Sequence, residues 1–286
     1  MNIIVGATGQ VGSMLISELS KKGAPVIAAV RDPGKVSLSG TRIRQVDLFN
    51  AQEVVQAFSG GTTAFLLTPE NPTADDIIAD TEKIVENYRK AVEANGIKRI
   101  VGLSCIGAQL DSRTGNILMS KILEAGFATL DIEKIFIRPA YFYSNWLAYS
   151  SIVEQYNVLP TFFPENLHVE MNSPLDLARF IADIMSQPMG MPARKVYELA
   201  GPAPYSSTDV ASTFATILGK EVLPQSIPPS QWKQTLLSAG FTENTAENLM
   251  DMTKAVIDGL AIPEFPDQII KLPTTLDCYL TEQLKG

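Results

Sequence analysis

The strongest constraint on the fold lies at the start of the sequence, where a short apolar run leads directly into a glycine-rich loop. Residues 2–5 are predicted to form a buried strand, the loop reads GATGQVG at 6–12, and residues 10–22 are predicted to form a helix. In such a unit the first glycine permits a tight turn, the second lets a pyrophosphate approach the backbone, and the third lets the helix pack against the strand.

The free N–H groups and the dipole of the following helix favour a diphosphate at that position. A glycine turn without a ligand is the alternative, but a second strand predicted at 25–30 supplies the context of a dinucleotide site. The residues expected to contact the dinucleotide here are Gly6, Thr8, Gly9, Gln10, Val11 and Gly12.

The residues after the second predicted strand bear on which dinucleotide binds. Arg31 lies about 20 residues past the loop, where the adenosine ribose is recognised. A guanidinium there suits the 2′-phosphate of NADP through bidentate hydrogen bonds, and Lys35 would add a second positive charge. Asp32 follows Arg31 directly, and a solvated charged turn is another interpretation. We predict NADP, with NAD as the alternative.

The first half of the chain alternates short apolar runs with longer amphipathic stretches. Asn50 is predicted to cap one helix, while Thr73 is expected to start another that ends at Gly96. This alternation predicts right-handed βαβ units and a parallel sheet covered on both faces. The predicted strands are 2–5, 25–30, 41–46, 62–67, 99–103 and 134–138, and the predicted helices are 10–22, 50–58, 75–95 and 115–125.

We therefore predict an α/β fold with a Rossmann-type doubly wound parallel sheet over residues 1–140. After about residue 141 the pattern loosens, and prolines and aromatics become frequent. Residues 141–286 are predicted to form a smaller α+β substrate region packed over one edge of the sheet. Its predicted elements are a strand at 196–199 and helices at 174–186, 207–218, 231–239 and 243–258.

Composition and charge limit the classes of partner that the protein is expected to bind. The chain has 286 residues and a net charge of -8 at pH 7, so an acidic surface disfavours nucleic acid and anionic membranes. No apolar run reaches the ~18 residues of a membrane span, and no secretory leader is recognisable. Two cysteines outside any metal-ligand spacing and one histidine, His168, argue against a metal site. We expect a cytoplasmic protein, as a monomer or homodimer.

Further short motifs follow the glycine loop in a fixed order. They are RDP at 31–33, VDL at 46–48, TP at 68–69, IRPAYFYSNW at 137–146, SPLD at 173–176 and LAGP at 199–202. In this order the motifs resemble the NmrA-like proteins, which are atypical members of the short-chain dehydrogenase/reductase superfamily. Within that group the chain resembles bacterial NADPH-dependent quinone, azo-dye and triphenylmethane reductases, and the resemblance spans most of its length.

The resemblance implies roles for particular residues. Asp47 and Leu48 would lie near adenine, and Thr68 and Pro69 would line the nicotinamide side. Lys121 would hydrogen-bond the nicotinamide ribose, and Pro139 with the residues after it would cover the carboxamide and open onto the substrate pocket.

Conventional members of the superfamily use a serine, a tyrosine and a lysine, in which the tyrosine donates the proton that accompanies hydride transfer. Ser104 and Lys121 occupy the serine and lysine positions here, whereas the tyrosine position holds Ile117. Ser104 and Lys121 are thus predicted to be catalytic and to contact the cofactor. A strand-end hydroxyl and a surface lysine are their structural alternatives. The proton would come from solvent, because a quinone or cationic dye stabilises its own charge.

Aromatic residues after the sixth predicted strand are the candidates for a substrate pocket, because ligands bind outside the carboxyl ends of a parallel sheet. A flat aromatic substrate could stack there, although core packing would also explain these residues. Tyr141 or Tyr143 is a candidate substitute acid. The predicted pocket residues are Tyr141, Phe142, Tyr143, Asn145 and Trp146.

Two functions fit these features. The first is an NADPH-dependent reductase that transfers hydride to a quinone-like or dye-like aromatic. The second is a non-catalytic dinucleotide sensor that acts through protein partners. The absent tyrosine fits both, while Lys121 and the aromatic residues favour the enzyme.

Overall fold

A central parallel sheet organises the molecule. The computed structural model describes residues 1–35, 41–111 and 113–285, and its eight-stranded sheet has the order β13-β10-β6-β5-β4-β1-β2-β3, with every neighbouring pair parallel. The strands are β1 (Asn2–Val5), β2 (Val26–Val30), β3 (Arg42–Gln45), β4 (Thr63–Leu67), β5 (Arg99–Leu103), β6 (Glu133–Pro139), β10 (Arg194–Ala200) and β13 (Ile270–Lys271). The strand order reverses at β1, which confirms the predicted doubly wound fold.

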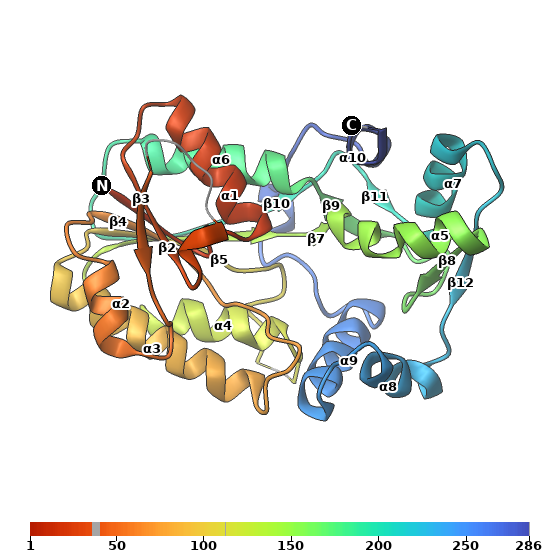
Figure 1. Ribbon diagram of the computed structural model, residues 1–286, viewed down its shortest axis with the longest axis horizontal. Coiled ribbons are helices and arrows are strands. Elements are labelled where there is room, and N and C mark those ends of the chain that lie inside the picture. Colours follow the sequence, from red (N-terminus) through yellow and green to blue (C-terminus); the bar gives the residue numbers. More distant parts are fainter. Residues whose placement is uncertain (36–40, 112, 286) are drawn as a thin grey trace.

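Helices cover both faces of this sheet (Figure 1). The first face carries α1 (Gln10–Lys21) and α6 (Pro174–Ser186). The second carries α2 (Ala51–Ala57), α3 (Ile77–Asn95) and α4 (Ile117–Gly126). The period of two in each strand explains the division. Ile4 packs on the α1 side, while Ile3 and Val5 pack on the α3 side.

Local signals set most helix ends. Asn50 caps α2 by accepting hydrogen bonds from the backbone N–H groups of Gln52 and Glu53, and Gly96 ends α3 in the left-handed region, at φ 61°. Both predictions are confirmed.

Three predicted helix starts are wrong by two residues. One is that of α8 (Pro229–Ser238), which was predicted to begin at 231. Helix α3 begins at Ile77 instead of 75, because Asp76 is the cap and accepts from the N–H groups of Ile78 and Ala79. Helix α4 begins at Ile117 instead of 115. Gly115 has φ +56° and lies against the backbone of α9 (Glu243–Ile257), so it is not helical.

The remainder of the chain forms a smaller α+β region beside the carboxyl ends of the sheet strands (Figure 1). Buried aromatic residues, among them Tyr143, Trp146 and Phe214, form its core. Its strands are β7 (Tyr141–Phe142), β8 (Val158–Thr161), β9 (Val169–Asn172), β11 (Pro204–Tyr205) and β12 (Leu223–Ser226), and its helical elements are η2 (Tyr143–Tyr149), α5 (Ser150–Tyr156), α7 (Ser207–Leu218), α8 (Pro229–Ser238), α9, η3 (Pro266–Gln268) and α10 (Leu276–Lys285).

The chain returns to the main sheet after residue 140. Strand β10 pairs with β6, β13 pairs with β10, and α6 packs against α1. We propose that residues 1–140 bind the dinucleotide and that residues 141–286 bind the substrate. Both segments contribute strands to the main sheet. In the described part of the chain, no helix is long and apolar enough to cross a membrane.

Candidate functional site

The glycine loop has the backbone geometry of a phosphate cradle. Gly6 has φ +67°, a conformation that favours glycine, and its carbonyl oxygen accepts a hydrogen bond of 2.9 Å from the N–H of Gly9. A Cβ on Gly12 would overlap the carbonyl oxygen of Gly6, so that position cannot carry a side chain without moving the loop. Gly9 caps α1, and no side-chain cap bonds that helix end. The first turn of α1 therefore presents its N–H groups to an anion.

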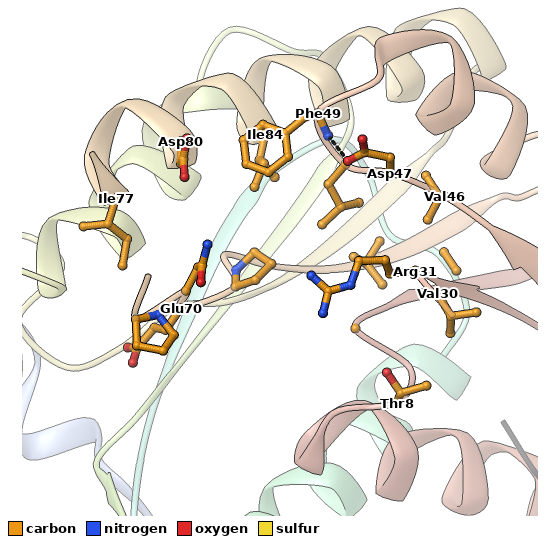
Figure 2. A pocket seen from close by; sticks show the side chains of 17 residues that line it. Thr8, Val30, Arg31, Val46, Asp47, Phe49, Glu70, Ile77, Asp80 and Ile84 are labelled. Atoms are coloured by element: carbon orange, nitrogen blue, oxygen red, sulfur yellow. Dashed lines mark hydrogen bonds between the residues drawn. The ribbon is translucent and has the colours of Figure 1, made fainter. Parts of the chain in front are cut away.

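A cavity of about 430 Å³ lies next to this loop, at the carboxyl ends of β1, β2 and β4. We call it the first cavity. Its lining runs from Val5 and the glycine loop to the start of α3 (Figure 2). The residues predicted to bind the cofactor that line it are Gly6, Thr8, Arg31, Asp47, Leu48 and Pro69.

Other predicted cofactor residues lie around the first cavity without lining it. Val11 and Gly12 are buried under the loop, and Lys35 is exposed in a short 3₁₀ turn, η1 (Pro33–Lys35). The amide oxygen of Gln10 accepts a hydrogen bond from the Ser144 hydroxyl at 2.9 Å, which links the loop to the smaller region.

The charged residues after β2 point in different directions. The guanidinium of Arg31 lies inside the first cavity (Figure 2). Asp32 is not part of that lining, and its carboxylate accepts a hydrogen bond from the N–H of Gly34 at 3.0 Å. Asp47, which follows β3 and also lines the cavity, accepts from the N–H of Phe49 at 3.0 Å. The side chain that faces the cavity from the end of β2 is thus the cation.

A second cavity, of about 340 Å³, lies at the carboxyl ends of β5 and β6. Cys105, Ile117, Pro139 and Tyr141 form its sheet side, and α9 with residues 259–263 forms the other wall. His168 supplies an imidazole and Glu170 a carboxylate to its lining. The lining is mainly apolar, which suits a hydrophobic ring better than a highly charged ligand.

The predicted aromatic pocket residues divide between this cavity and the core. Tyr141 lines the second cavity, and its ring packs edge to face against Phe163, with centroids 5.6 Å apart. Phe142 packs against the core on the α1 side, and Asn145 is exposed. The prediction that Tyr143 and Trp146 line a pocket is wrong. Both are buried, because Tyr143 packs on other tyrosines and the Trp146 indole N–H donates to the sulfur of Met171.

Ser104 and Lys121 are engaged with other protein groups. The hydroxyl of Ser104 is buried and donates to the Glu124 carboxylate at 2.6 Å. The ammonium of Lys121 donates to the Leu110 carbonyl at 2.8 Å and pairs with Asp111. Their contact with a cofactor stays a prediction, and Lys121 would have to exchange these partners to make it.

A buried ionic network lies next to the second cavity. The sequence motifs do not indicate these ion pairs. Arg138 pairs with Glu124, Glu198 and Glu264. Burial alone would raise the pKa of Glu124, but hydrogen bonds from Arg138 and Ser104 outweigh it and hold the pKa below 4.5. Glu198 also accepts the N–H groups of Glu264 and Phe265. The network thereby fixes the 259–265 segment against the sheet.

Glu70 is another residue that the motifs do not single out. It follows Pro69 after β4 and lies at the end of the first cavity away from Arg31 (Figure 2). The Glu70 side chain is exposed to solvent, yet desolvation of its carboxyl raises its pKa above 4.5, and the neighbouring Asn116 side chain opposes this only in part. The available sequence signal was its position directly after the TP motif.

The sequence is similar to one family of known proteins. The NmrA-like family matches residues 2–280. The NAD(P)H azoreductase of Xenophilus azovorans is 26% identical over 262 residues, which cover 88% of this chain and 86% of that protein. Quinone oxidoreductase 2 of Escherichia coli is 25% identical over 259 residues, covering 88% of this chain and 86% of that protein.

Solved structures share the fold over the full length. The crystal structure of an NADPH-dependent quinone oxidoreductase from Escherichia coli, complexed with NADPH, superposes with a TM-score of 0.83 at 24% identity and covers 100% of both chains. Its similarity extends through the smaller region as well as the sheet.

Proposed function

The chain belongs to the NmrA-like family, and on that premise we propose that it is an NADPH-dependent reductase of quinone-like or dye-like aromatic acceptors. The observation that carries the proposal is the pair of cavities at the carboxyl ends of one parallel sheet. The first combines a glycine cradle with the Arg31 guanidinium, and the second is mainly apolar. Its relatives include an NAD(P)H azoreductase and a quinone oxidoreductase, and these names supply the acceptor class.

The residues of the first cavity fit a phosphorylated dinucleotide. The N–H groups at the start of α1 would hold the diphosphate, and Arg31 would hold the 2′-phosphate through charge-assisted hydrogen bonds. Leu48 offers an apolar contact to adenine, as the family resemblance implies. When bound, the reduced nicotinamide supplies a hydride.

The residues of the second cavity would orient the acceptor. Pro139 and Tyr141 lie where the sheet strands end, and the Tyr141 ring would give a flat acceptor a surface on which to stack. Ile117, at the first turn of α4, takes the position of the usual tyrosine and lines the same cavity. An isoleucine cannot donate a proton, so the chain would work without the usual tyrosine donor. Lys121 and Ser104 keep their proposed roles near the ribose.

A screen of NADPH oxidation tests this function. Purified protein is mixed with NADPH and with simple quinones, azo dyes or triphenylmethane dyes, and NADH is run in parallel. We expect oxidation with at least one acceptor class and faster turnover with NADPH than with NADH at subsaturating concentrations. Tight NADPH binding by calorimetry without oxidation by any acceptor would contradict the enzyme and favour a dinucleotide sensor.

A further inference from the structure

The site needs a source of protons for acceptors that become anionic on reduction. We infer, on the basis of the proposed function, that Glu70 is the acid that donates this proton, in place of the tyrosine that Ile117 replaces. Glu70 lies outside the serine, tyrosine and lysine positions of the superfamily.

The position of Glu70 is the first support. It lines the first cavity at the end remote from Arg31 (Figure 2), and that remote end is where the reactive half of an extended dinucleotide would lie if Arg31 held its adenosine phosphate. Its negative charge also acts on Cys105 and Tyr141, two residues of the second cavity. The Glu70 carboxyl thus borders the first cavity, and its charge reaches residues of the second.

Asn116 is the second support. It precedes Ile117 at the start of α4, is 9% exposed, and is the neighbouring side chain that lowers the pKa of Glu70. The side-chain oxygen of Asn116 is buried and has no hydrogen-bond partner among the described residues. An amide can donate to a carboxylate and can accept from a carboxylic acid. A protonated Glu70 would supply the donor that this orphan oxygen lacks.

The groups around Glu70 favour its acid form. Desolvation raises the pKa of Glu70, and the neighbouring Cys105 and Tyr141 are neutral at pH 7. Burial raises the pKa of Cys105 to about 11 and raises that of Tyr141 further, and the Glu70 charge adds to both shifts. Tyr141, named above as a possible substitute acid, is therefore a weaker proton donor than a carboxylic acid in the same place.

The charged groups on the surrounding elements do not offset the rise in the pKa of Glu70. Lys121 on α4 is paired with Asp111, and Asp80 on α3 adds a negative charge at the first cavity. Arg31 lies at the opposite end. In the second cavity, Glu170 is paired with Lys271 at 2.8 Å, and His168 lies 3.6 Å from Asp209. Among the described residues, no cation forms an ion pair with the Glu70 carboxyl.

The proton balance depends on the acceptor. A quinone that takes a hydride becomes a hydroquinone anion, and the O–H bond of Glu70 then breaks as a new O–H bond forms on the hydroquinone oxygen. The electron pair stays on the Glu70 carboxylate, which regains a proton from water. A triphenylmethane dye cation takes the hydride at its central carbon and becomes neutral, so it needs no proton.

This difference gives the test. Glu70→Gln keeps the shape of the side chain and removes the proton, and Glu82→Gln, an exposed change on α3, is the matched control. Single-turnover NADPH oxidation is measured for each protein with a simple quinone and with a triphenylmethane dye cation. We expect Glu70→Gln to slow quinone reduction about 100-fold, the lower range for loss of a general acid, and to slow dye reduction far less.

The pH profile and a cofactor-free measurement complete the test. Quinone reduction by the natural protein should fall as pH rises through the Glu70 pKa, and dye reduction should show no such decline. Infrared difference spectra of the cofactor-free protein should contain a carboxylic acid band that titrates above pH 4.5 and is missing in Glu70→Gln. Equal slowing with both acceptors, no slowing with quinone, or no such band would overturn the inference. Absence of all oxidation by the natural protein would instead overturn the proposed function.

Discussion

Arg138 and Glu124 form a two-pronged ion pair inside the protein. The guanidinium Nε lies 2.8 Å from Oε1 of Glu124, and one terminal nitrogen lies 2.8 Å from Oε2. The pair joins β6 to α4, and Arg194 reaches the same carboxylate at 2.7 Å. Because Arg138 also contacts Glu198 and Glu264, one cation balances several buried or partly buried carboxylates.

Arg138→Met should therefore destabilise the fold strongly. The variant keeps a similar side-chain length but leaves carboxylates buried without their cation, and we expect a loss of about 3–5 kcal/mol in the free energy of unfolding. Urea denaturation measures it. The control is Arg89→Met, which breaks an exposed pair with Glu93 and should cost about 0.5 kcal/mol or less. Similar losses for both variants would contradict this account.

Acid should weaken the same network. The pKa of Glu124 is lower in the folded protein than its ordinary value of 4.5. A lowered carboxyl pKa contributes stability above the unfolded value, and this contribution is lost as pH falls through the folded value. Unfolding free energies measured from neutral pH to below 4.5 should therefore decrease. Glu124→Gln should show a shallower decrease, and an unchanged slope would argue that other carboxylates control it.

Arg31→Ala should weaken NADPH binding selectively. Loss of charge-assisted hydrogen bonds to a 2′-phosphate costs about 1.5–3 kcal/mol, or roughly 10–100-fold in Kd. NADH affinity should stay the same, because NADH lacks that phosphate. Calorimetry with both nucleotides measures the ratio. Lys35→Ala, a change outside the first cavity, should have a smaller effect, and an unchanged ratio in Arg31→Ala would refute the assignment of Arg31.

Gly12→Ala and Gly9→Ala should differ in kind. An added Cβ at position 12 overlaps the Gly6 carbonyl, whereas at position 9 the nearest atom is 3.2 Å away. We expect Gly12→Ala to lower stability and nucleotide affinity together, and Gly9→Ala to affect affinity with little change in stability. Thermal unfolding without nucleotide and calorimetry with NADPH separate the two. Equal stability of both variants would show that the loop relaxes easily.

Ile117→Ala tests the residue at the tyrosine position. Ile117 is 4% exposed, so its truncation should cost about 2–5 kcal/mol of stability and should change the fit of acceptors in the second cavity. Hydride transfer should persist, because this side chain carries no proton. Complete loss of NADPH oxidation with the fold and nucleotide binding unchanged would contradict its assignment as a non-donor.

The predictable part of the fold was the part coded by local pattern. Strand β5 and helices α6 and α7 have the predicted bounds, since apolar periodicity and nearby caps define them. The two-residue strands β7, β11 and β13 were missed. Segments this short have no readable period, and their partners, such as Met171 for Tyr141, lie far along the chain.

The residues of the candidate site also divide into those that the local sequence could predict and those that depend on the fold. Arg31 could be predicted because the glycine loop fixes its distance along the chain. Glu70 could not be predicted, because its environment includes Asn116, which the fold brings close from another part of the chain. Tyr143 and Trp146 look like pocket residues in the sequence, and only tertiary packing shows that they belong to the core.

The main sheet is completed by residues that come late in the chain. Its last two strands along the chain, β10 and β13, are contributed by residues 194–200 and 270–271, long after the glycine loop. During synthesis, β6 would lack its neighbour β10, and Arg138 would stay unburied. The sheet that residues 1–140 begin could not be completed before nearly the whole chain had emerged. A fragment cut at residue 140 would therefore expose an unpaired sheet edge, and it should aggregate rather than bind nucleotide.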